Sequence, residues 1–446
     1  MVEGIETRIN GLHRVVVTGL GAVSPLGNNV QDTWQSLIEG KSGIRRISLE
    51  TGRDWDGPVN STVDIAGLVQ GLEPGKYISA KQLRRIHMSV VYSTVGMIEA
   101  FADAGLLDVE NKPDGLNYRL KNVNPERVGA RIGTGIGGGS VIAEIEDVIR
   151  DKGDRRISPV AILQLLSERV VTVPSMILGY QGGVAAIVAA CASANIAQGG
   201  AFDRLKLGRE DVISTGGVEE AIHRIAIGGF NAMRALSMDN DNPVSASRPF
   251  NKDANGFVMG EGSGILIFET LEHALGRGAG GHILAEVVGY GETSDAFHDT
   301  EPSGEGARRA MRLALEEARI QPWEVDYINA HGTSTPTGDP VELDALMEVF
   351  GEPLKGIAIS STKSMSGHLL GGSGGLEAVV CIRSIMDGII HPTINLHDPI
   401  KEGLNLVPNV AQRREIKIAM SNSFGFGGIN SVLIFRRFQG SYERVA

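Results

Sequence analysis

The chain has 446 residues, 42% of them hydrophobic, and a formal net charge of −11, which is typical of a globular protein too long for one ordinary core. The acidic balance disfavours general binding to nucleic acid, and two cysteines are too few for a disulfide framework, so we expect a reducing, cytoplasmic compartment. No apolar run approaches the roughly 18 residues of a membrane span, and residues 1–13 lack the apolar region of a secretory signal.

The same order of elements occurs twice along the chain. The first series has a strand that ends in a Gly-x-Gly turn, then a helix, then four strands, expected at 14–21, 86–107, 127–135, 185–190, 211–217 and 265–268. The second series repeats that order at 283–291, 306–320, 326–332, 357–361, 416–422 and 432–435. We therefore predict an α/β protein with two βαβαβαββ halves, residues 14–270 and 281–437. Each half has a mostly parallel sheet, and together they form a five-layer α-β-α-β-α sandwich with pseudo-twofold symmetry.

Two segments of the first half are longer than their counterparts in the second. Residues 109–125 have no role that the sequence indicates. Residues 138–181 are interpreted as a cap over the site and as a surface for a partner. The site itself is expected at the carboxyl ends of strands from both halves.

One cysteine stands where a strand changes into a helix. Small and apolar residues at 185–190 predict a buried strand, Cys191 follows it, and a helix continues to about Leu207. Unpaired N–H groups and the positive end of a helix dipole lower the pKa of a thiol at such a junction. Cys191 is therefore a candidate nucleophile, and the alternative is a buried core cysteine.

Two histidines in the second half complete the candidate site. His331 ends the strand at 326–332, and His368 begins a helix five residues after Lys363. The duplication puts His368 at the position that Cys191 occupies in the first half. We expect all three side chains to converge near the pseudo-twofold axis, where a thiol and two histidines can form and use a thioester.

From about Arg14 to Arg437 the chain resembles the β-ketoacyl-acyl-carrier-protein synthases of the thiolase superfamily, most closely the type II condensing enzyme of fatty-acid synthesis. The motifs that carry the resemblance are Val17-Thr18-Gly19-Leu20-Gly21, the Cys191 segment, and residues 329–342, 361–371 and 421–430. Ala192 departs from the family, which usually has Thr or Ser after the thiol. The change leaves the nucleophile intact and slightly alters the wall near the acyl chain.

The resemblance implies a thiolase-like duplicated fold and an acyltransferase that needs no metal or cofactor. Cys191 would hold an acyl group, malonyl carrier protein would lose CO₂, and the resulting enolate would attack the acyl thioester. His331 and His368 would donate Nε2–H to the thioester oxygen as negative charge develops there. The backbone N–H groups of Cys191 and Phe426 would form an oxyanion hole, and the Phe426 ring would act as a gate.

Other residues receive supporting roles from the same resemblance. Lys363 would tune the histidines, the alternative being a solvated lysine at a helix start. Glu342 would pair with Lys363, and a carboxylate in the first turn of a helix, stabilised by the dipole, is favoured over a direct catalytic role for it. Ile136 would line the far end of the acyl pocket. Cys381, in an apolar helix, is interpreted as a core residue.

The partners implied are an acidic acyl carrier protein, loaded with acyl or malonyl groups, and a second copy of the chain. The strand at 185–190 would pair antiparallel with its copy. The docking surface for the carrier protein should be basic, the alternative being scattered solvated side chains. The residues implied are Lys81, Arg84, Arg85, Arg155, Arg156 and Arg234.

Competing functions differ in the residues that they require. A degradative thiolase needs a second catalytic cysteine near the C-terminus, and residues 421–430 contain none. A non-catalytic chain-length factor would lack the nucleophile. A ketosynthase of polyketide assembly would keep all three site residues and stays open. A dinucleotide-dependent oxidoreductase would depend on the Gly-x-Gly-x-x-Gly of residues 133–138, but no acidic strand end follows it about 20 positions later, where Arg155, Arg156 and Ile157 stand instead.

Overall fold

The computed structural model describes residues 5–47, 62–112 and 115–439. Two segments discussed above are therefore described only in part. Residues 1–4 of the segment 1–13 and residues 113–114 of the segment 109–125 lie outside the described residues. Within the described ranges, no helix combines the length and the apolar character needed to cross a membrane.

A ten-stranded sheet runs through the molecule in the order β14-β13-β17-β18-β12-β3-β11-β10-β8-β9. The strands of the first half are β3 (Val15–Val23), β8 (Val128–Gly133), β9 (Val184–Ile187), β10 (Val212–Glu219) and β11 (Gly262–Thr270). Those of the second half are β12 (Ala285–Ser294), β13 (Tyr327–Asn329), β14 (Ala358–Ser360), β17 (Ile418–Gly425) and β18 (Ile429–Arg436). In each half the strands lie in the order third, second, fourth, fifth, first, so the predicted duplication is confirmed.

The two halves meet at their first strands. β3 and β12 pair antiparallel through Val15–Val17 and Ala285–Val287, which makes one continuous sheet of the two halves. In each half the second strand pairs parallel with the third and the fourth strands. The fifth strand pairs antiparallel with the fourth and the first. The prediction of a mostly parallel sheet in each half is therefore wrong. In the second half the reason is local, because a tight turn at 426–428 joins β17 to β18 without a helical crossover.

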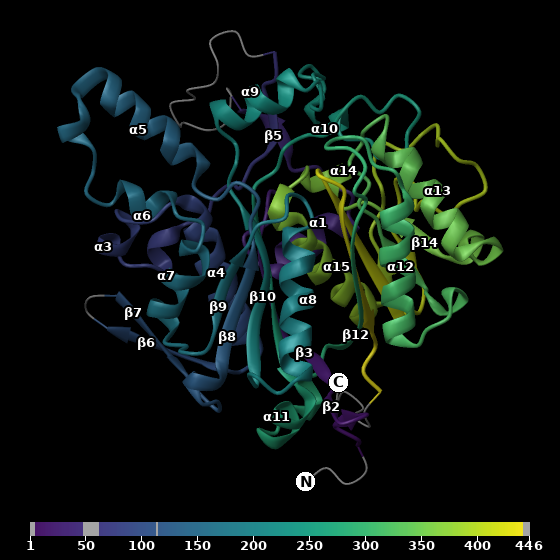
Figure 1. Ribbon diagram of the computed structural model, residues 1–446, viewed down its shortest axis with the longest axis horizontal. Coiled ribbons are helices and arrows are strands. Elements are labelled where there is room, and N and C mark those ends of the chain that lie inside the picture. Colours follow the sequence, from purple (N-terminus) through teal and green to yellow (C-terminus); the bar gives the residue numbers. More distant parts are fainter. Residues whose placement is uncertain (1–4, 48–61, 113–114, 440–446) are drawn as a thin grey trace.

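Helices complete five layers, as expected (Figure 1). The helices α8 (Ser193–Lys206) and α15 (Ser373–Asp387) lie in the middle and each contacts strands of both halves. The first half is covered on its outer face by α4 (Met88–Asp103) and α7 (Arg169–Leu178). The second half is covered by α12 (Glu305–Ala318) and α13 (Gly338–Phe350).

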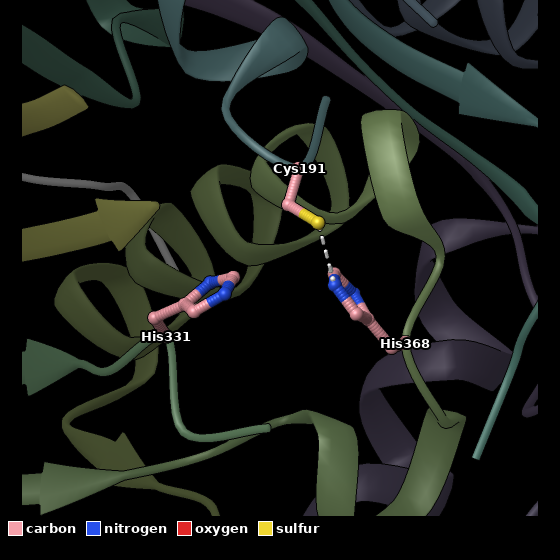
Figure 2. Close-up of side chains that lie close together, drawn as sticks. All are labelled: Cys191, His331 and His368. Carbon is pink, nitrogen blue, oxygen red and sulfur yellow. Dashed lines mark hydrogen bonds between the residues drawn. The ribbon is translucent and has the colours of Figure 1, made fainter. Parts of the chain in front are cut away.

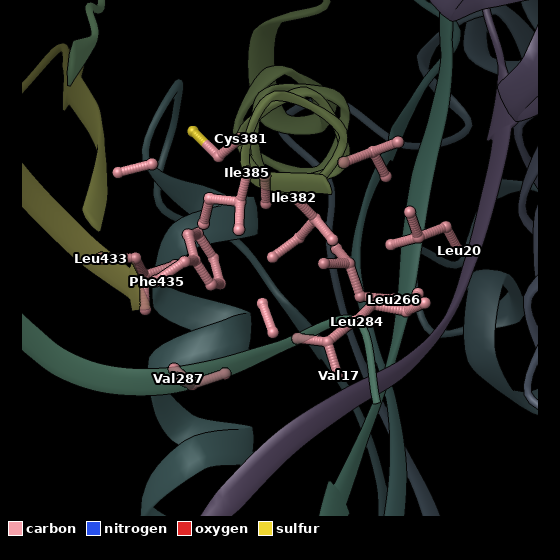
Figure 3. Packing of buried hydrophobic residues seen from close by; sticks show 14 of the residues in the cluster. Val17, Leu20, Leu266, Leu284, Val287, Cys381, Ile382, Ile385, Leu433 and Phe435 are labelled. Carbon is pink, nitrogen blue, oxygen red and sulfur yellow. The ribbon is translucent and has the colours of Figure 1, made fainter. Parts of the chain in front are cut away.

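The largest core lies where α15 faces strands of both halves. Val17, Leu266 and Phe435 belong to this cluster together with Cys381 and Ile385 of α15 (Figure 3). Cys381 is fully buried there, so its interpretation as a core residue is confirmed. The apolar strands of both halves thus bury their inner faces against the same pair of helices.

Glycines allow the helices to pack closely on the sheet. Gly21 of β3 faces α4, where an added Cβ would stand 1.9 Å from the carbonyl oxygen of Gly96. At Gly264 of β11 a Cβ would stand 2.1 Å from the backbone nitrogen of Leu376 in α15. Only a residue without a side chain fits at either position.

The long segments of the first half form structure of their own. Within the first of them, β6 (Leu107–Lys112) pairs antiparallel with β7 (Gly115–Leu120). Residues 139–178 make α5 (Gly139–Lys152), α6 (Ala161–Leu165) and α7. The remaining α-helices and β-strands are β1 (Arg8–Ile9), β2 (Leu12–His13), α1 (Val30–Ile38), β4 (Ile44–Arg46), β5 (Ile65–Gly67), α3 (Ala80–Leu83), α9 (Arg224–Ala232), α10 (Pro243–Ala246), α11 (Leu271–Gly276), α14 (Lys363–Ser366), β15 (Ile389–Ile390) and β16 (Gln412–Arg413).

Candidate active site

The candidate nucleophile sits on a strained turn between β9 and α8. The strand before it ends at Ile187 and is partly exposed, so the expectation of a buried strand at 185–190 is wrong for the single chain. Ala190, directly before Cys191, has φ of +47°, in the left-handed region that an alanine rarely adopts. The Ser193 hydroxyl holds this turn, because its Oγ accepts from the Ala189 N–H at 2.8 Å and donates to the Ala190 carbonyl at 2.6 Å. Cys191 is only 9% exposed.

The three residues expected to converge do so (Figure 2). Cys191 Sγ lies 3.0 Å from Nε2 of His368, and the rings of His331 and His368 are 5.4 Å apart. One ligand atom from each of the three residues falls within 4.8 Å of the others. The thiol comes from the first half and both imidazoles from the second, so the site requires both halves.

The surroundings of His368 define its tautomer. The Leu370 backbone N–H donates to Nδ1 of His368 at 3.2 Å, and the Ser373 hydroxyl lies 2.8 Å from the same nitrogen. A backbone N–H can only donate, so Nδ1 is an acceptor in the neutral ring. The proton of His368 therefore sits on Nε2, facing Cys191.

Burial controls the charge of all three groups. It lowers the pKa of His331 and of His368 well below the usual value, and the nearby Lys363 charge lowers both further, so both imidazoles are neutral. Burial raises the pKa of the Cys191 thiol to about 12, although the Lys363 charge and a hydrogen bond from the Phe426 N–H oppose the increase. The expectation of a lowered thiol pKa is therefore wrong, because enclosure of the thiol outweighs the Lys363 charge and the Phe426 N–H.

Lys363 is buried and paired, but not with Glu342. Its ammonium forms an ion pair with Glu377 of α15, and both side chains are 2% exposed. The Glu342 carboxylate instead accepts the backbone N–H groups of His331 and Gly332 at 2.8 and 2.7 Å. It also accepts a side-chain N–H of Asn422 at 3.3 Å. Glu342 thus fixes the backbone that carries His331. It lies beyond the first turn of α13, so its expected place in a helix's first turn is wrong, as is the alternative of a solvated Lys363.

Phe426 lies in the turn between β17 and β18 and is 36% exposed. Its backbone N–H bonds to the Cys191 thiol, and a Cβ on the preceding Gly425 would stand 3.2 Å from the Cys191 backbone nitrogen. Its ring lies 6.4 Å from that of Phe230 in α9. Sequence reasoning missed Phe230, because nothing near it in the chain carries chemistry.

Ile136 packs against the cluster that contains the thiol. This cluster, here called the Cys191 cluster, includes Cys191, Phe257 and Leu370, with Ile136 and Phe230 packed on it. The position suits contact with a group attached to the sulfur. The surroundings of Cys191 are therefore apolar in character, as contact with an apolar group would require.

The six basic residues expected to dock a carrier protein are all exposed. They lie on or next to α3, on the short 3₁₀ helix η3 (Asp154–Arg156) that follows α5, and after α9, and α5 packs against α9. Within the part of the chain that the structure describes, none of the six forms an ion pair. These residues are Lys81, Arg84, Arg85, Arg155, Arg156 and Arg234.

The glycine pattern at 133–138 has its backbone N–H groups occupied. The Glu219 carboxylate accepts those of Gly135 at 2.7 Å and of Ile136 and Gly137 at 3.2 Å each. A dinucleotide phosphate would need those donors, so the oxidoreductase alternative loses its one supporting motif. Among the described residues, the group with the donor atoms and proximity for a metal ion is the Cys191, His331 and His368 trio itself.

A duplicated five-layer α/β sandwich with its site between the halves is the architecture of the thiolase-like fold. A β-ketoacyl synthase structure from Burkholderia phymatum matches with a TM-score of 0.85 at 32% identity, covering 96% of this chain and 100% of that one. A structure described as the ishigamide ketosynthase/chain length factor matches with a TM-score of 0.84 at 32% identity and the same coverage.

Comparisons of sequence agree with those of structure. Residues 12–274 match the model of the β-ketoacyl synthase N-terminal domain, and residues 284–397 match that of the C-terminal domain. The 3-oxoacyl-acyl-carrier-protein synthase 2 of Staphylococcus aureus strain COL is 44% identical over 96% of this chain and 99% of that protein. The protein of the same name from Synechocystis is 42% identical over 96% of this chain and 98% of its own. The chain belongs to the β-ketoacyl synthase family.

Proposed function

We propose that the chain catalyses the decarboxylative condensation of an acyl group held on Cys191 with malonyl-acyl carrier protein, and so extends fatty acids by two carbons. The observation that carries the proposal is the placement of the Cys191 thiol 3.0 Å from Nε2 of His368, with His331 beside them. The proposal is supported by relatives named 3-oxoacyl-acyl-carrier-protein synthase 2.

The first half-reaction transfers the acyl group. Cys191 sulfur attacks the thioester carbonyl of the acyl carrier protein, the carbon–sulfur bond to the carrier breaks, and the thiol proton passes to the departing carrier thiol. The Phe426 N–H, which contacts the sulfur, and the Cys191 N–H are the proposed donors to the tetrahedral oxyanion. Because the resting thiol is neutral, we expect deprotonation to accompany attack.

The second half-reaction forms the new carbon–carbon bond. Malonyl-acyl carrier protein loses CO₂, and the electron pair of the broken bond forms an enolate whose oxygen needs hydrogen-bond donors. Neutral Nε2–H groups of His331 and His368 are suited to this task, since buried imidazoles near Lys363 stay uncharged. The enolate carbon attacks the acyl-Cys191 carbonyl, and collapse of the intermediate releases the thiolate, which is reprotonated.

The carrier protein is the proposed partner. Exposed basic side chains on a chain of net charge −11 suit an acidic partner, because opposite charges speed and orient encounter. Phe426 and Phe230 would lie beside the entering acyl group, and the flanking glycines of Phe426 would let its ring move. Ile136 would limit the length of the chain on Cys191.

The proposal also covers assembly, organisation and compartment. The strand β9 is the last of the ten-stranded sheet, and its open edge suits antiparallel pairing with a second copy. Residues 14–270 and 281–437 are proposed as the two thiolase-like halves. Two free cysteines, one of them the nucleophile, suit a reducing cytoplasm.

A ketosynthase of polyketide assembly is the second candidate. A solved structure described as a ketosynthase/chain length factor supports it, at 32% identity. The relatives with a fatty-acid type name reach 44% identity, so we favour fatty-acid elongation. A chain-length factor alone is disfavoured, since Cys191 is present and faces His368.

Mass spectrometry of the intact protein tests the proposal. We expect saturated acyl carrier proteins of several lengths to add one acyl group at Cys191, and malonyl carrier protein then to release a product two carbons longer. Failure of every saturated acyl group to load, with loading of polyketide intermediates, would favour the second candidate. Absence of any acyl-enzyme would contradict both.

A further inference from the structure

A fully buried carboxylate outside the catalytic trio holds two loops of the site together. Glu219 ends β10, and its Oε1 accepts the N–H groups of Ile136 and Gly137 at 3.2 Å each. Its Oε2 accepts the N–H of Gly135 at 2.7 Å and that of Gly371 at 3.1 Å. Four backbone donors thus converge on one side chain, and these contacts oppose the rise in the pKa of Glu219 that its burial causes.

The two loops that Glu219 joins carry different tasks. The first, residues 134–137, contains Ile136 and packs against the Cys191 cluster. The second, residues 368–372, contains His368 and has a strained backbone at its middle residue, since Leu370 has φ of +45°. The loops also touch directly, because a Cβ on Gly371 would stand only 2.1 Å from the nitrogen of Gly135.

We propose that Glu219 is a positioning residue that fixes the Ile136 loop to the His368 loop, and thereby sets both the acyl-length limit and the alignment of His368 with the thiol. The proposal deepens the proposed condensation and depends on it for its catalytic part. Movement of the Ile136 loop against a longer acyl chain would pull on Gly371 through the shared carboxylate. With its two loops joined by Glu219, the site therefore favours acyl chains that fit without moving the Ile136 loop.

Glu219→Gln tests the role of the carboxylate with little change of shape. An amide has one acceptor oxygen, so whichever way it turns, its NH₂ group faces at least two backbone N–H donors. Those donors lose their partners in a buried site, and the loops separate. Glu99→Gln is the matched control. Glu99 is also a largely buried carboxylate that accepts two backbone N–H groups, of Ala22 and Val30, at 2.8 Å each, and it lies away from the site.

The first measurement needs no substrate. Hydrogen exchange of the full-length protein should show faster exchange in peptides that contain residues 134–137 and 368–372 of Glu219→Gln than in wild type. In Glu99→Gln these two peptides should exchange as in wild type. Unchanged protection of both peptides in a folded Glu219→Gln protein would overturn the proposal, whatever the outcome for the proposed reaction.

The second measurement follows acyl loading and condensation by mass spectrometry. We expect Glu219→Gln to load chains just beyond the wild-type limit about tenfold faster, and to condense short chains about tenfold more slowly, the size expected for losing hydrogen bonds to a charged group. Both rates should be unchanged in Glu99→Gln. Equal losses of melting temperature in the two variants, with the wild-type length limit retained in both, would show that Glu219 is merely structural.

Glu219→Asp keeps the proposal testable if Glu219→Gln does not fold. Aspartate retains two acceptor oxygens on a shorter side chain, so it cannot reach both loops as Glu219 does. Faster exchange in at least one of the two peptides would support the proposal, and wild-type protection of both would overturn it. A wild-type protein that takes no acyl group would contradict the proposed function but leave the exchange result to decide the role of Glu219 in holding the loops.

Discussion

The Leu370 backbone N–H donates to Nδ1 of His368 at 3.2 Å, and this contact directs the imidazole proton toward the thiol. The ring therefore presents Nε2–H to Cys191 at 3.0 Å. A neutral donor in this position can stabilise a thiolate or an enolate oxygen without first taking up a proton. His368 thus serves the proposed reaction as a donor rather than as a base.

The two histidines are expected to matter for decarboxylation more than for acylation. Replacement by alanine removes the Nε2–H donor, and each loss should slow CO₂ release by about 10²–10³-fold. The measurement follows release of labelled CO₂ and acyl transfer to Cys191 separately. His368→Gln, whose amide can donate to the same region, should retain more activity than His368→Ala. Wild-type CO₂ release in both alanine variants would remove the assigned role.

Cys191→Ala should abolish acyl-enzyme formation and condensation. The thiol is the one group of the trio that can form the thioester, and its loss leaves the histidines in place. Cys381→Ala is the control, because this second buried cysteine belongs to the central core and should affect stability but not loading. Intact-protein mass spectrometry reads both variants. An acyl adduct on Cys191→Ala would place the nucleophile elsewhere.

The sequence predicted the duplicated strand order because each half repeats the same apolar strands and glycine turns at matching positions. The trio could be predicted for the same reason, since equivalent strand ends meet at the axis. The mixed pairing of the sheets could not, because apolar strands look alike whether their neighbours are parallel or antiparallel.

Contacts between distant segments escaped prediction. Glu377 lies on an apolar helix, and only the fold brings its carboxylate to Lys363. The pKa of the Cys191 thiol escaped prediction for the same reason. The strand-to-helix junction, which predicted a lowered pKa, is a local feature, whereas the burial that raises the pKa comes from segments distant in the sequence. Glu219 likewise gives no local signal, because its four backbone donors come from two loops far apart in the sequence.

Acid should destabilise the protein partly through His391. This buried ring donates Nδ1–H to the Pro392 carbonyl at 2.9 Å, and its Nε2 faces the Thr362 hydroxyl at 3.1 Å. Burial lowers the pKa of His391 from 6.5 to about 4. Between these values the unfolded chain takes up a proton that the folded chain does not, so stability falls as pH decreases through this range, by about 3 kcal/mol in total.

Chemical unfolding at pH 7 and at pH 4.5 measures this effect. His391→Gln removes the titrating ring but keeps a polar side chain, so its free energy of unfolding should fall less between the two pH values than that of wild type. The comparison uses the change with pH, because the variant can also differ in stability at pH 7. An equal change in both proteins would show that His391 does not contribute.

The open edge of β9 should pair two chains. Val184 and Val188 at this edge are 38% and 61% exposed, and Met176 on the adjacent α7 is 68% exposed. Light scattering at micromolar concentration should give twice the chain mass of 47.3 kDa. Val184→Lys together with Met176→Glu should shift the mass toward one chain, and Trp323→Glu, at an exposed position of the second half, should not. A monomer mass for wild type would contradict the prediction.

Ile136 should limit the length of the acyl chain on Cys191. It packs on the Cys191 cluster, so volume added there takes space from the substrate. Each excluded CH₂ loses roughly 0.8 kcal/mol of burial, and forcing it into the remaining space adds strain. Ile136→Phe should therefore load long acyl groups much more slowly, while short groups load as in wild type.

The test compares loading rates across acyl lengths with the melting temperature of each protein. Val410→Phe supplies the control, because Val410 in the second half is 73% exposed and a larger ring there should leave loading unchanged. A melting temperature close to wild type separates a shortened pocket from an unfolded protein. Since the Ile136 loop is held by Glu219, a smaller loss with Ile136→Val in the same assay would further tie the effect to side-chain volume. A folded Ile136→Phe protein that loads long chains at the wild-type rate would show that Ile136 does not face the acyl group.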